Sequence, residues 1–197
     1  ISRGYGSFID QEEYTNLIDS VTKVTNDIFD NYNIVVKKHP REVKSYWNEV
    51  AQNNSSIQIT ENHIMQVTAD VDFAISFWSS AALDCYLLGL PVIEFFDPNK
   101  SKKSVSHGVS NGDTVYRKLG VVLPANTRSQ LVKAISEIKR NNYRKLPNYQ
   151  HPFVDDMLNY SNKWKCEFNK ILDTNDFFGN KNSAKKKLTN DIKGSKN

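Results

Sequence analysis

Cysteine is scarce in this sequence: of 197 residues, only Cys85 and Cys166 are cysteines. The two lie far apart, so their spacing indicates neither a disulfide framework nor a thiolate metal cluster. Cys85 falls on the apolar face of an expected helix, and we predict that its side chain is buried. Few cysteines and no signal-like apolar start are typical of a reducing compartment, so we expect a cytosolic protein.

Long hydrophobic runs are missing as well. No stretch of the sequence approaches the roughly 18 consecutive apolar residues that a membrane-spanning helix needs. We therefore predict a soluble, cytoplasmic chain. Peripheral association of its parent protein with the inner face of the plasma membrane is left open.

An excess of one sign of charge is confined to the end of the chain. The formal net charge is +4, and much of that excess comes from Lys181, Lys185, Lys186, Lys187, Lys193 and Lys196. The remainder of the chain is close to neutral, so we expect no nucleic-acid partner. The same tail has little to bury, and we predict that residues 177–197 are disordered.

Apolar residues recur instead in short runs that alternate between helical and strand periodicity. Residues 8–30 form an expected amphipathic helix with acidic residues in its first turn. The expected strands cover residues 34–36, 57–60, 73–76, 91–96 and 120–123. The other expected helices cover residues 41–52, 64–69, 79–88 and a segment capped by Asn126-Thr127. This alternation predicts an α/β fold with a Rossmann-like, doubly wound parallel sheet.

The length fits one folded domain and a tail. We assign residues 1–145 to the Rossmann-like domain, 146–176 to a linker and a C-terminal helix with an aromatic face, and 177–197 to the tail. The chain begins at Ile1, directly before a glycine-containing loop, which we interpret as a cut inside or just after a strand of a longer protein.

A histidine follows the first complete strand. The run Lys37-Lys38-His39-Pro40 comes directly after residues 34–36, which predicts an imidazole at the carboxyl edge of the sheet, with a backbone stiffened by the proline. Such a group can donate to a phosphate oxygen or protonate a leaving group. The alternative is a loop histidine chosen for turn geometry. His151-Pro152 follows a polar linker instead, and we predict a structural role for it.

A pair of serines follows the strand at residues 73–76. Trp78-Ser79-Ser80 would offer hydroxyls, free N–H groups and the positive end of a helix dipole, which together make an anion site. The alternative is that the serines only cap the helix. The presence of His39 after another strand of the same sheet favours the phosphate-binding interpretation.

Several further positions are weaker candidates. Arg3 and Gly4 belong to a glycine loop whose backbone could approach a phosphate, although the loop lacks the third glycine of a dinucleotide fingerprint. Glu61, after the strand at 57–60, could contact a base or ribose. Cations around residues 97–113, Arg117 among them, could meet an anionic acceptor or only solvent.

Three segments together carry a family resemblance: Lys38-His39-Pro40, Ser79-Ser80-Ala81-Ala82-Leu83-Asp84 and Gly89-Leu90-Pro91-Val92-Ile93. Over residues 1–140 the chain resembles the nucleotide-binding C-terminal half of GT-B glycosyltransferases. The resemblance is to bacterial capsule and surface-polysaccharide enzymes, namely Kdo transferases, sialyltransferases and the glycerophosphotransferases of teichoic acid synthesis.

The resemblance implies that His39 contacts the donor phosphate and assists departure of the nucleotide, while Ser79 and Ser80 bind that phosphate. It implies a nucleotide-sugar donor, in the Kdo and sialic acid members a CMP-sugar, transferred with inversion to a glycan or glycolipid acceptor without a metal or other cofactor. The N-terminal half, which supplies the catalytic base, is absent from this chain. Trp78 stands where the family would have a smaller or different residue.

Two other interpretations stay open. A nucleotide-sugar 2-epimerase shares this fold, but that family's acidic and glycine-rich signature is not found here. A non-catalytic module could instead use the sheet edge and the aromatic terminal helix to bind a partner chain.

Overall fold

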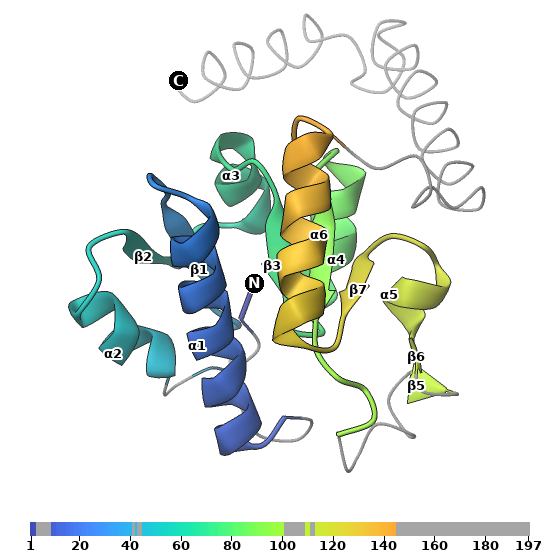
Figure 1. The fold of residues 1–197 in the computed structure, drawn as a ribbon, viewed down its shortest axis with the longest axis horizontal. Helices are drawn as coiled ribbons and strands as arrows, with labels where there is room; N and C mark the ends of the chain where they lie inside the picture. Colours follow the sequence, from blue (N-terminus) through green and yellow to red (C-terminus); the bar gives the residue numbers. More distant parts are fainter. Residues whose placement is uncertain (3–8, 41, 43–44, 101–108, 111–112, 145–197) are drawn as a thin grey trace, which may run out of the picture. The chain divides into compact units, whose positions relative to one another are not determined.

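Helices and strands alternate along the chain in this computed structural model, which describes residues 1–2, 9–40, 42, 45–100, 109–110 and 113–144 (Figure 1). The elements in chain order are α1 (Gln11–Ile28), β1 (Ile34–Lys37), α2 (Tyr46–Gln52), β2 (Ile57–Thr60), α3 (Ile64–Val67), the 3-10 turn η1 (Thr68–Asp70), β3 (Ala74–Ser76), α4 (Ala81–Leu87), β4 (Val92–Phe95), β5 (Val109–Ser110), β6 (Asp113–Thr114), α5 (Val115–Lys118), β7 (Leu123–Ala125) and α6 (Arg128–Arg140).

The longer strands pair in parallel and form two small sheets. β1 pairs with β2, and β4 lies between β3 and β7 in the second sheet. β5 and β6 form an antiparallel pair on their own. The prediction of an α/β fold with parallel strands between helices is therefore confirmed.

Two N-terminal residues hydrogen-bond to both parallel sheets. The Ile1 amino group donates to the Ile75 carbonyl oxygen (2.5 Å), and the Phe77 N–H donates to the Ile1 carbonyl oxygen (3.3 Å). On the other side, the Ser2 N–H donates to the Lys37 carbonyl oxygen (3.0 Å). Figure 1 accordingly shows the N-terminus between β1 and β3.

Helices cover both faces of the strands. In Figure 1, α1 and α6 lie side by side in front of the strands, and α4 lies behind them. α6 contacts β4 and β7, α4 contacts β3 and β4, and α3 contacts β1. Parallel strands covered on both faces are typically apolar along their whole length, as β4 is: all four of its residues are buried.

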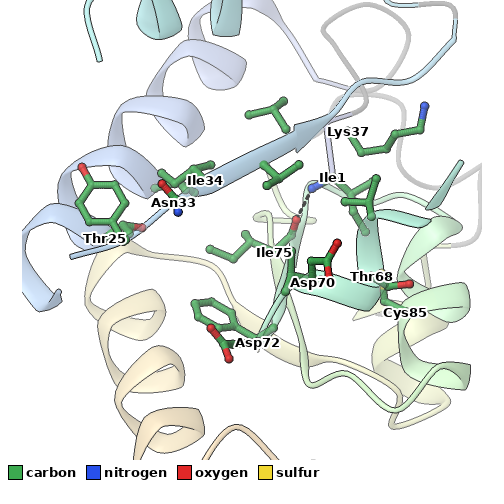
Figure 2. Close-up of a pocket in the computed structure, with 18 of the residues that line it drawn as sticks. Ile1, Thr25, Asn33, Ile34, Lys37, Thr68, Asp70, Asp72, Ile75 and Cys85 are labelled. Carbon is green, nitrogen blue, oxygen red and sulfur yellow. Dashed lines mark hydrogen bonds between the residues drawn. The ribbon is translucent and has the colours of Figure 1, made fainter. Parts of the chain in front are cut away.

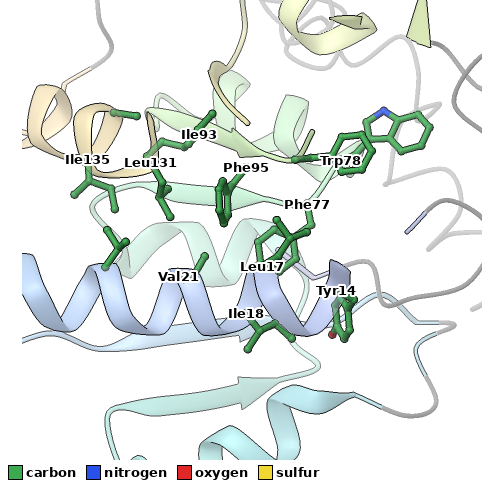
Figure 3. Packing of buried hydrophobic residues seen from close by; sticks show 14 of the residues in the cluster. Tyr14, Leu17, Ile18, Val21, Phe77, Trp78, Ile93, Phe95, Leu131 and Ile135 are labelled. Carbon is green, nitrogen blue, oxygen red and sulfur yellow. The ribbon is translucent and has the colours of Figure 1, made fainter. Parts of the chain in front are cut away.

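The core lies where α1 and α6 meet the strands. Figure 3 shows Leu17 and Val21 of α1 facing Leu131 of α6 and Ile93 and Phe95 of β4, which lie above them in this view. Each such side chain stabilises the fold by about 1.5–3 kcal/mol when it leaves water. The spacing of apolar residues in α1 made this face predictable, and the Asp10 side chain caps the helix by accepting from the Glu13 N–H (2.8 Å). Cys85, also predicted to be buried, is fully so, and burial raises its thiol pKa to about 11.

Several expected boundaries differ from those observed. The helix expected over 41–52 begins at Tyr46, because the backbone of Ser45 is extended, with a φ of -131° and a ψ of 127°. The strand expected over 120–123 is β7, three residues later. Gly120 has a positive φ of 65° and its N–H donates to the Arg117 carbonyl, so it ends α5, which was not predicted.

The predicted C-terminal helix, the tail and the boundaries near 145 and 176 fall outside the described residues and stay predictions. Among the helices that the structure describes, none has both the length and the apolar character needed to cross a bilayer.

In a sample of the 197-residue chain, the Ile1 ammonium makes the free energy of unfolding depend on pH. Burial lowers its pKa from 8.0 to about 6, and the Glu42 carboxylate offsets part of this shift. Between these pH values the unfolded chain binds a proton that the folded chain does not. The free energy of unfolding should therefore rise with pH from 6 to 8, by about 1–2 kcal/mol after allowance for partial solvent exposure.

Urea unfolding at several pH values would measure this rise, with an N-terminally acetylated chain as the control. Acetylation removes the titrating amine and leaves every histidine in place. If the two forms show the same pH profile between 6 and 8, the ammonium is not desolvated in the way the structure indicates.

Candidate functional site

The loops that follow β1, β2 and β3 come together at one edge. β1 and β2 are parallel, so the loops containing His39 and Glu61 leave the same end of that sheet. Ile1 makes the hydrogen bonds of a residue paired in parallel with Ser76. β3 therefore runs in the same direction as β1 and β2, and the serine loop leaves at the same edge. The carboxyl edge of parallel strands is where α/β proteins bind nucleotides.

A buried carboxylate holds the loop that contains His39. The Glu42 N–H donates to the His39 carbonyl oxygen (2.9 Å), which closes a turn around Pro40. The Glu42 side chain is 8% exposed and accepts hydrogen bonds from the Ser2 hydroxyl (2.9 Å) and the Tyr14 hydroxyl. The turn is thus fixed to α1 and to the N-terminal residues.

This network was missed at the level of sequence. The apolar periodicity of residues 8–30 places Tyr14 on the inner face of α1, where its ring lies against Phe77. Its hydroxyl, however, also lies 3.1 Å from the Ser45 hydroxyl. Burial, and then the bond to Glu42, raises the pKa of Tyr14 well above its usual range. No periodicity signals such a group, because a tyrosine on a helix's inner face looks like any other core residue.

The His39 loop leaves its side chains accessible. Lys38 and His39 are half-buried and Pro40 is exposed. The Lys37 ammonium donates to the Glu61 carbonyl oxygen (3.3 Å), so the loops after β1 and β2 are also joined to each other. Glu61 itself is exposed, and its carboxylate can reach solvent at this edge.

The two serines after β3 have different environments. Ser79 is buried, its N–H donates to the Ser76 hydroxyl (3.1 Å), and its own hydroxyl accepts from the Ala81 N–H (3.4 Å). Ser80 is exposed and makes no side-chain cap. Ser79 therefore has the capping role that was the alternative interpretation, while the Ser80 hydroxyl is available to a ligand.

Trp78 gives this loop its shape. Its backbone has a φ of 53°, the left-handed region that residues other than glycine rarely adopt. Its side chain is 3% exposed and stacks on Phe96, with ring centroids 5.5 Å apart and planes at 10°. The indole lies in the core beside Phe77 (Figure 3), so only the backbone of Trp78 lies where a ligand could contact it.

Ile1 and Ser2 lie between the ends of β1 and β3, so the described parts of the His39 and serine loops leave strands that are two strand spacings apart, about 10 Å. A phosphate contacted by both loops would sit beyond Ser2. Arg3 and Gly4, which were also predicted to contact it, lie outside the described residues.

A second buried polar cluster, at β4, was missed by the sequence reasoning. The Arg117 side chain is 4% exposed, and its Nε donates to Glu94 Oε2 at 2.6 Å. Further Arg117 nitrogens donate to the Phe96 carbonyl oxygen (2.6 Å) and to Asn126 Oδ1 (2.6 Å). Arg117 is thus engaged inside the protein and not presented to an acceptor.

Glu94 is fully buried in this cluster. Its Oε2 also accepts from the Thr114 hydroxyl (2.7 Å), and its Oε1 has no hydrogen-bond partner among the described residues. Burial raises the Glu94 pKa, against the opposing effects of Thr114 and Arg117. The cluster ties α5 and the loop before α6 to β4, which makes its role structural.

Within the described residues, no group of three histidine, cysteine or acidic side chains is arranged to hold a metal ion. Comparison with known proteins adds no family: no protein-family profile, no curated protein and no solved structure matches this chain.

The Glu42 network can be tested by a double-mutant cycle. Glu42→Gln keeps the shape and removes the charge, and Tyr14→Phe removes one donor. Each should lower the free energy of unfolding by about 1–3 kcal/mol, and the double variant should lose less than the sum, because the two groups bond each other. Urea denaturation measures all three variants, and strict additivity would contradict a shared network.

The Arg117–Glu94 ion pair can be tested by removing its two charges one at a time and then together. Arg117→Met should cost about 3–5 kcal/mol, because it leaves a buried carboxylate without its cation. Adding Glu94→Gln to that variant should recover part of the loss, although Glu94→Gln alone is destabilising. Thermal and urea unfolding of the three variants would check this, and a double variant less stable than Arg117→Met would show that the carboxylate is not buried with its charge.

Proposed function

We propose that this chain is the donor-nucleotide-binding domain of a GT-B glycosyltransferase of surface-polysaccharide synthesis. If Ile1–Ser2 is counted as the first strand, the two sheets become one, with the order β2, β1, Ile1–Ser2, β3, β4, β7. This is the order 3-2-1-4-5-6 of a Rossmann-like doubly wound sheet, and the hydrogen bonds from Ile1 to Ile75 and from Ser2 to Lys37 support it.

One observation carries the proposal: Ile1 and Ser2, which complete the strand order, also lie between the His39 loop and the serine loop. In the order given above, the strand order reverses beside Ile1–Ser2, and doubly wound sheets bind nucleotides in the crevice at such a reversal. The His39 turn on one side and Ser80 on the other would flank a phosphate there.

The roles follow from the exposure of each side chain. The half-buried Lys38 and His39 supply positive charge and an N–H donor for the donor phosphates, and the exposed Ser80 supplies a hydroxyl. Ser79 and the Trp78 backbone hold the serine loop in place. Glu61 contacts the base or ribose, and Arg3 and Gly4 complete the phosphate contacts.

The proposed reaction transfers the sugar with inversion. A base from another domain removes the proton of an acceptor hydroxyl, whose oxygen attacks the anomeric carbon as the bond to the donor phosphate breaks. The electron pair of that bond stays on the phosphate, where His39 stabilises the developing negative charge. This domain alone would bind the donor and leave the acceptor chemistry to its partner domain.

Calorimetric titration with CMP, CDP, UMP, UDP and GDP tests the proposal. One nucleotide should bind selectively, and CMP is expected from the resemblance to Kdo and sialic acid transferases. His39→Ala and Ser80→Ala should each weaken that binding roughly 5- to 150-fold, the scale of a lost hydrogen bond to a charged group.

Ser55→Ala is the matched control for Ser80→Ala. Ser55 is also an exposed serine, but it precedes β2 and so lies at the opposite end of that strand. Its replacement should leave the affinity unchanged. Equal effects of the two serine variants, or no binding of any nucleotide by a folded sample, would remove the basis for a donor site and favour a module that binds a partner chain.

A further inference from the structure

The cavity between the two parallel sheets is unusual in its position. It has a volume of about 470 Å³ and is lined along its length by the facing edges of β1 and β3. Figure 2 shows Ile34 and Lys37 of β1 on one side and Ile75 of β3 on the other, with Ile1 at one end. We call this cavity the strand slot.

The β1 edge turns toward the slot the backbone groups that it does not use in pairing with β2. The Ile34 N–H donates to the Ser56 carbonyl oxygen (2.8 Å), so the backbone N–H and C=O groups of Ile34 and Val36 are directed toward β2. Alternation along a strand then directs the backbone groups of Val35 and Lys37 the other way. The bond from Ser2 to the Lys37 carbonyl oxygen agrees with this direction.

The β3 edge is arranged in the same way. The Ala74 N–H donates to the Pro91 carbonyl oxygen (3.0 Å), so Ala74 and Ser76 face β4. Ile75 and Phe77 therefore face the slot, and both bond to Ile1. The slot thus lies between two strand edges that run in one direction, with their backbone groups in matching alternation.

Ile1 and Ser2 occupy only the carboxyl end of the slot. Ile1 bonds to β3 and Ser2 to β1, which is how successive residues of a central parallel strand divide their bonds between two neighbours. The slot is therefore one strand wide. Burial of the Ile1 ammonium also lowers its pKa, whereas a peptide N–H at that atom would make the same bond to Ile75 without a charge.

The faces of the slot carry mainly apolar side chains, with Thr25 and Thr68 among them. Val21 of α1 and Phe29 directly after that helix line one face, and Ile64 of α3 and Cys85 of α4 line the other. A strand buried on both faces is a continuous apolar run. Asp70 and Asp72 also line the cavity, and both are exposed to solvent.

We propose that the strand slot is a docking site for one extended, apolar peptide strand that runs parallel to β1 and β3 and leads into Ile1. A basic residue at its start suits the two exposed carboxylates. The docked strand joins the β1-β2 sheet to the β3-β4-β7 sheet through backbone hydrogen bonds. This inference does not depend on nucleotide binding.

The register of the docked strand follows from the bonds already present. The residue directly before Ile1 donates its N–H to the Val35 carbonyl oxygen, and its own carbonyl oxygen accepts from the Lys37 N–H. The residue before that accepts from the Ile75 N–H and donates to the Phe73 carbonyl oxygen. The amides of Val35, Lys37 and Ile75 thereby gain partners, while those of Val36 and Ala74 already have them.

The test adds six residues to the full chain before Ile1. One variant carries Lys-Lys-Ile-Val-Ile-Val and the matched control carries Lys-Lys-Asn-Ser-Asn-Ser, so both have the same length and charge. The apolar extension should raise the melting temperature by at least about 5 °C over the unextended chain, because it buries apolar surface. The polar extension should leave the melting temperature within about 1 °C.

Amide hydrogen exchange locates the added strand. In the apolar variant, exchange at Val35, Lys37 and Ile75 should slow at least tenfold more than at Val36 and Ala74, which serve as internal controls. Sedimentation should show the same molecular mass per particle for both extended chains. This readout stands apart from the nucleotide titration, so either proposal can fail alone.

Three results would overturn the proposal. Equal stabilisation by both extensions would show that the slot does not select apolar residues. Uniform slowing across all five amides would show stabilisation without strand pairing. Association of the apolar variant into larger particles, with no local protection, would show that the extension binds a second copy and not the slot.

Discussion

The described structure depends on a junction of three backbone hydrogen bonds made by Ile1 and Ser2. They are the bonds that cross from the β1-β2 sheet to the β3-β4-β7 sheet through the strand position between them. Without this junction, the two sheets would be held by helix packing, chiefly where α1 meets α6. Ile1 and Ser2 therefore help to set the relative placement of the His39 and serine loops, and the Ser2 hydroxyl also takes part in the Glu42 network.

Two buried carboxylates stabilise different parts of the fold in different ways. Glu42 accepts from hydroxyl groups and fixes the turn after β1, whereas Glu94 pairs with Arg117 and fixes the segments around β4. A buried ion pair contributes little net stability against an apolar alternative, but breaking it is costly. The Glu94 cluster consequently specifies which segments meet, and the apolar core supplies most of the energy that holds them.

Sequence reasoning predicted the elements that carry a strong period. α1 and α6 have apolar stripes and capping residues, Asp10 and Thr127, whose side chains accept from the backbone as such caps do. β2 was predicted at its observed bounds. The interpretation failed where one residue decides a boundary, as Gly120 does at the end of α5. It also could not find Glu42, Glu94 or Arg117 as buried partners, because their burial depends on contacts between residues distant in sequence.

The junction also bears on the order in which this chain can fold. β1 and β2 are joined by a short helical connection, and so are β3 and β4, so each half closes only small loops. The bond from Ile1 to Ile75 instead joins residues 74 positions apart. Loop-closure entropy favours the nearer contacts first, so we expect each half to gain structure before the junction forms. The junction then acts as the final closure of the fold, and a chain caught before that step would expose the edges of β1 and β3 to other strands.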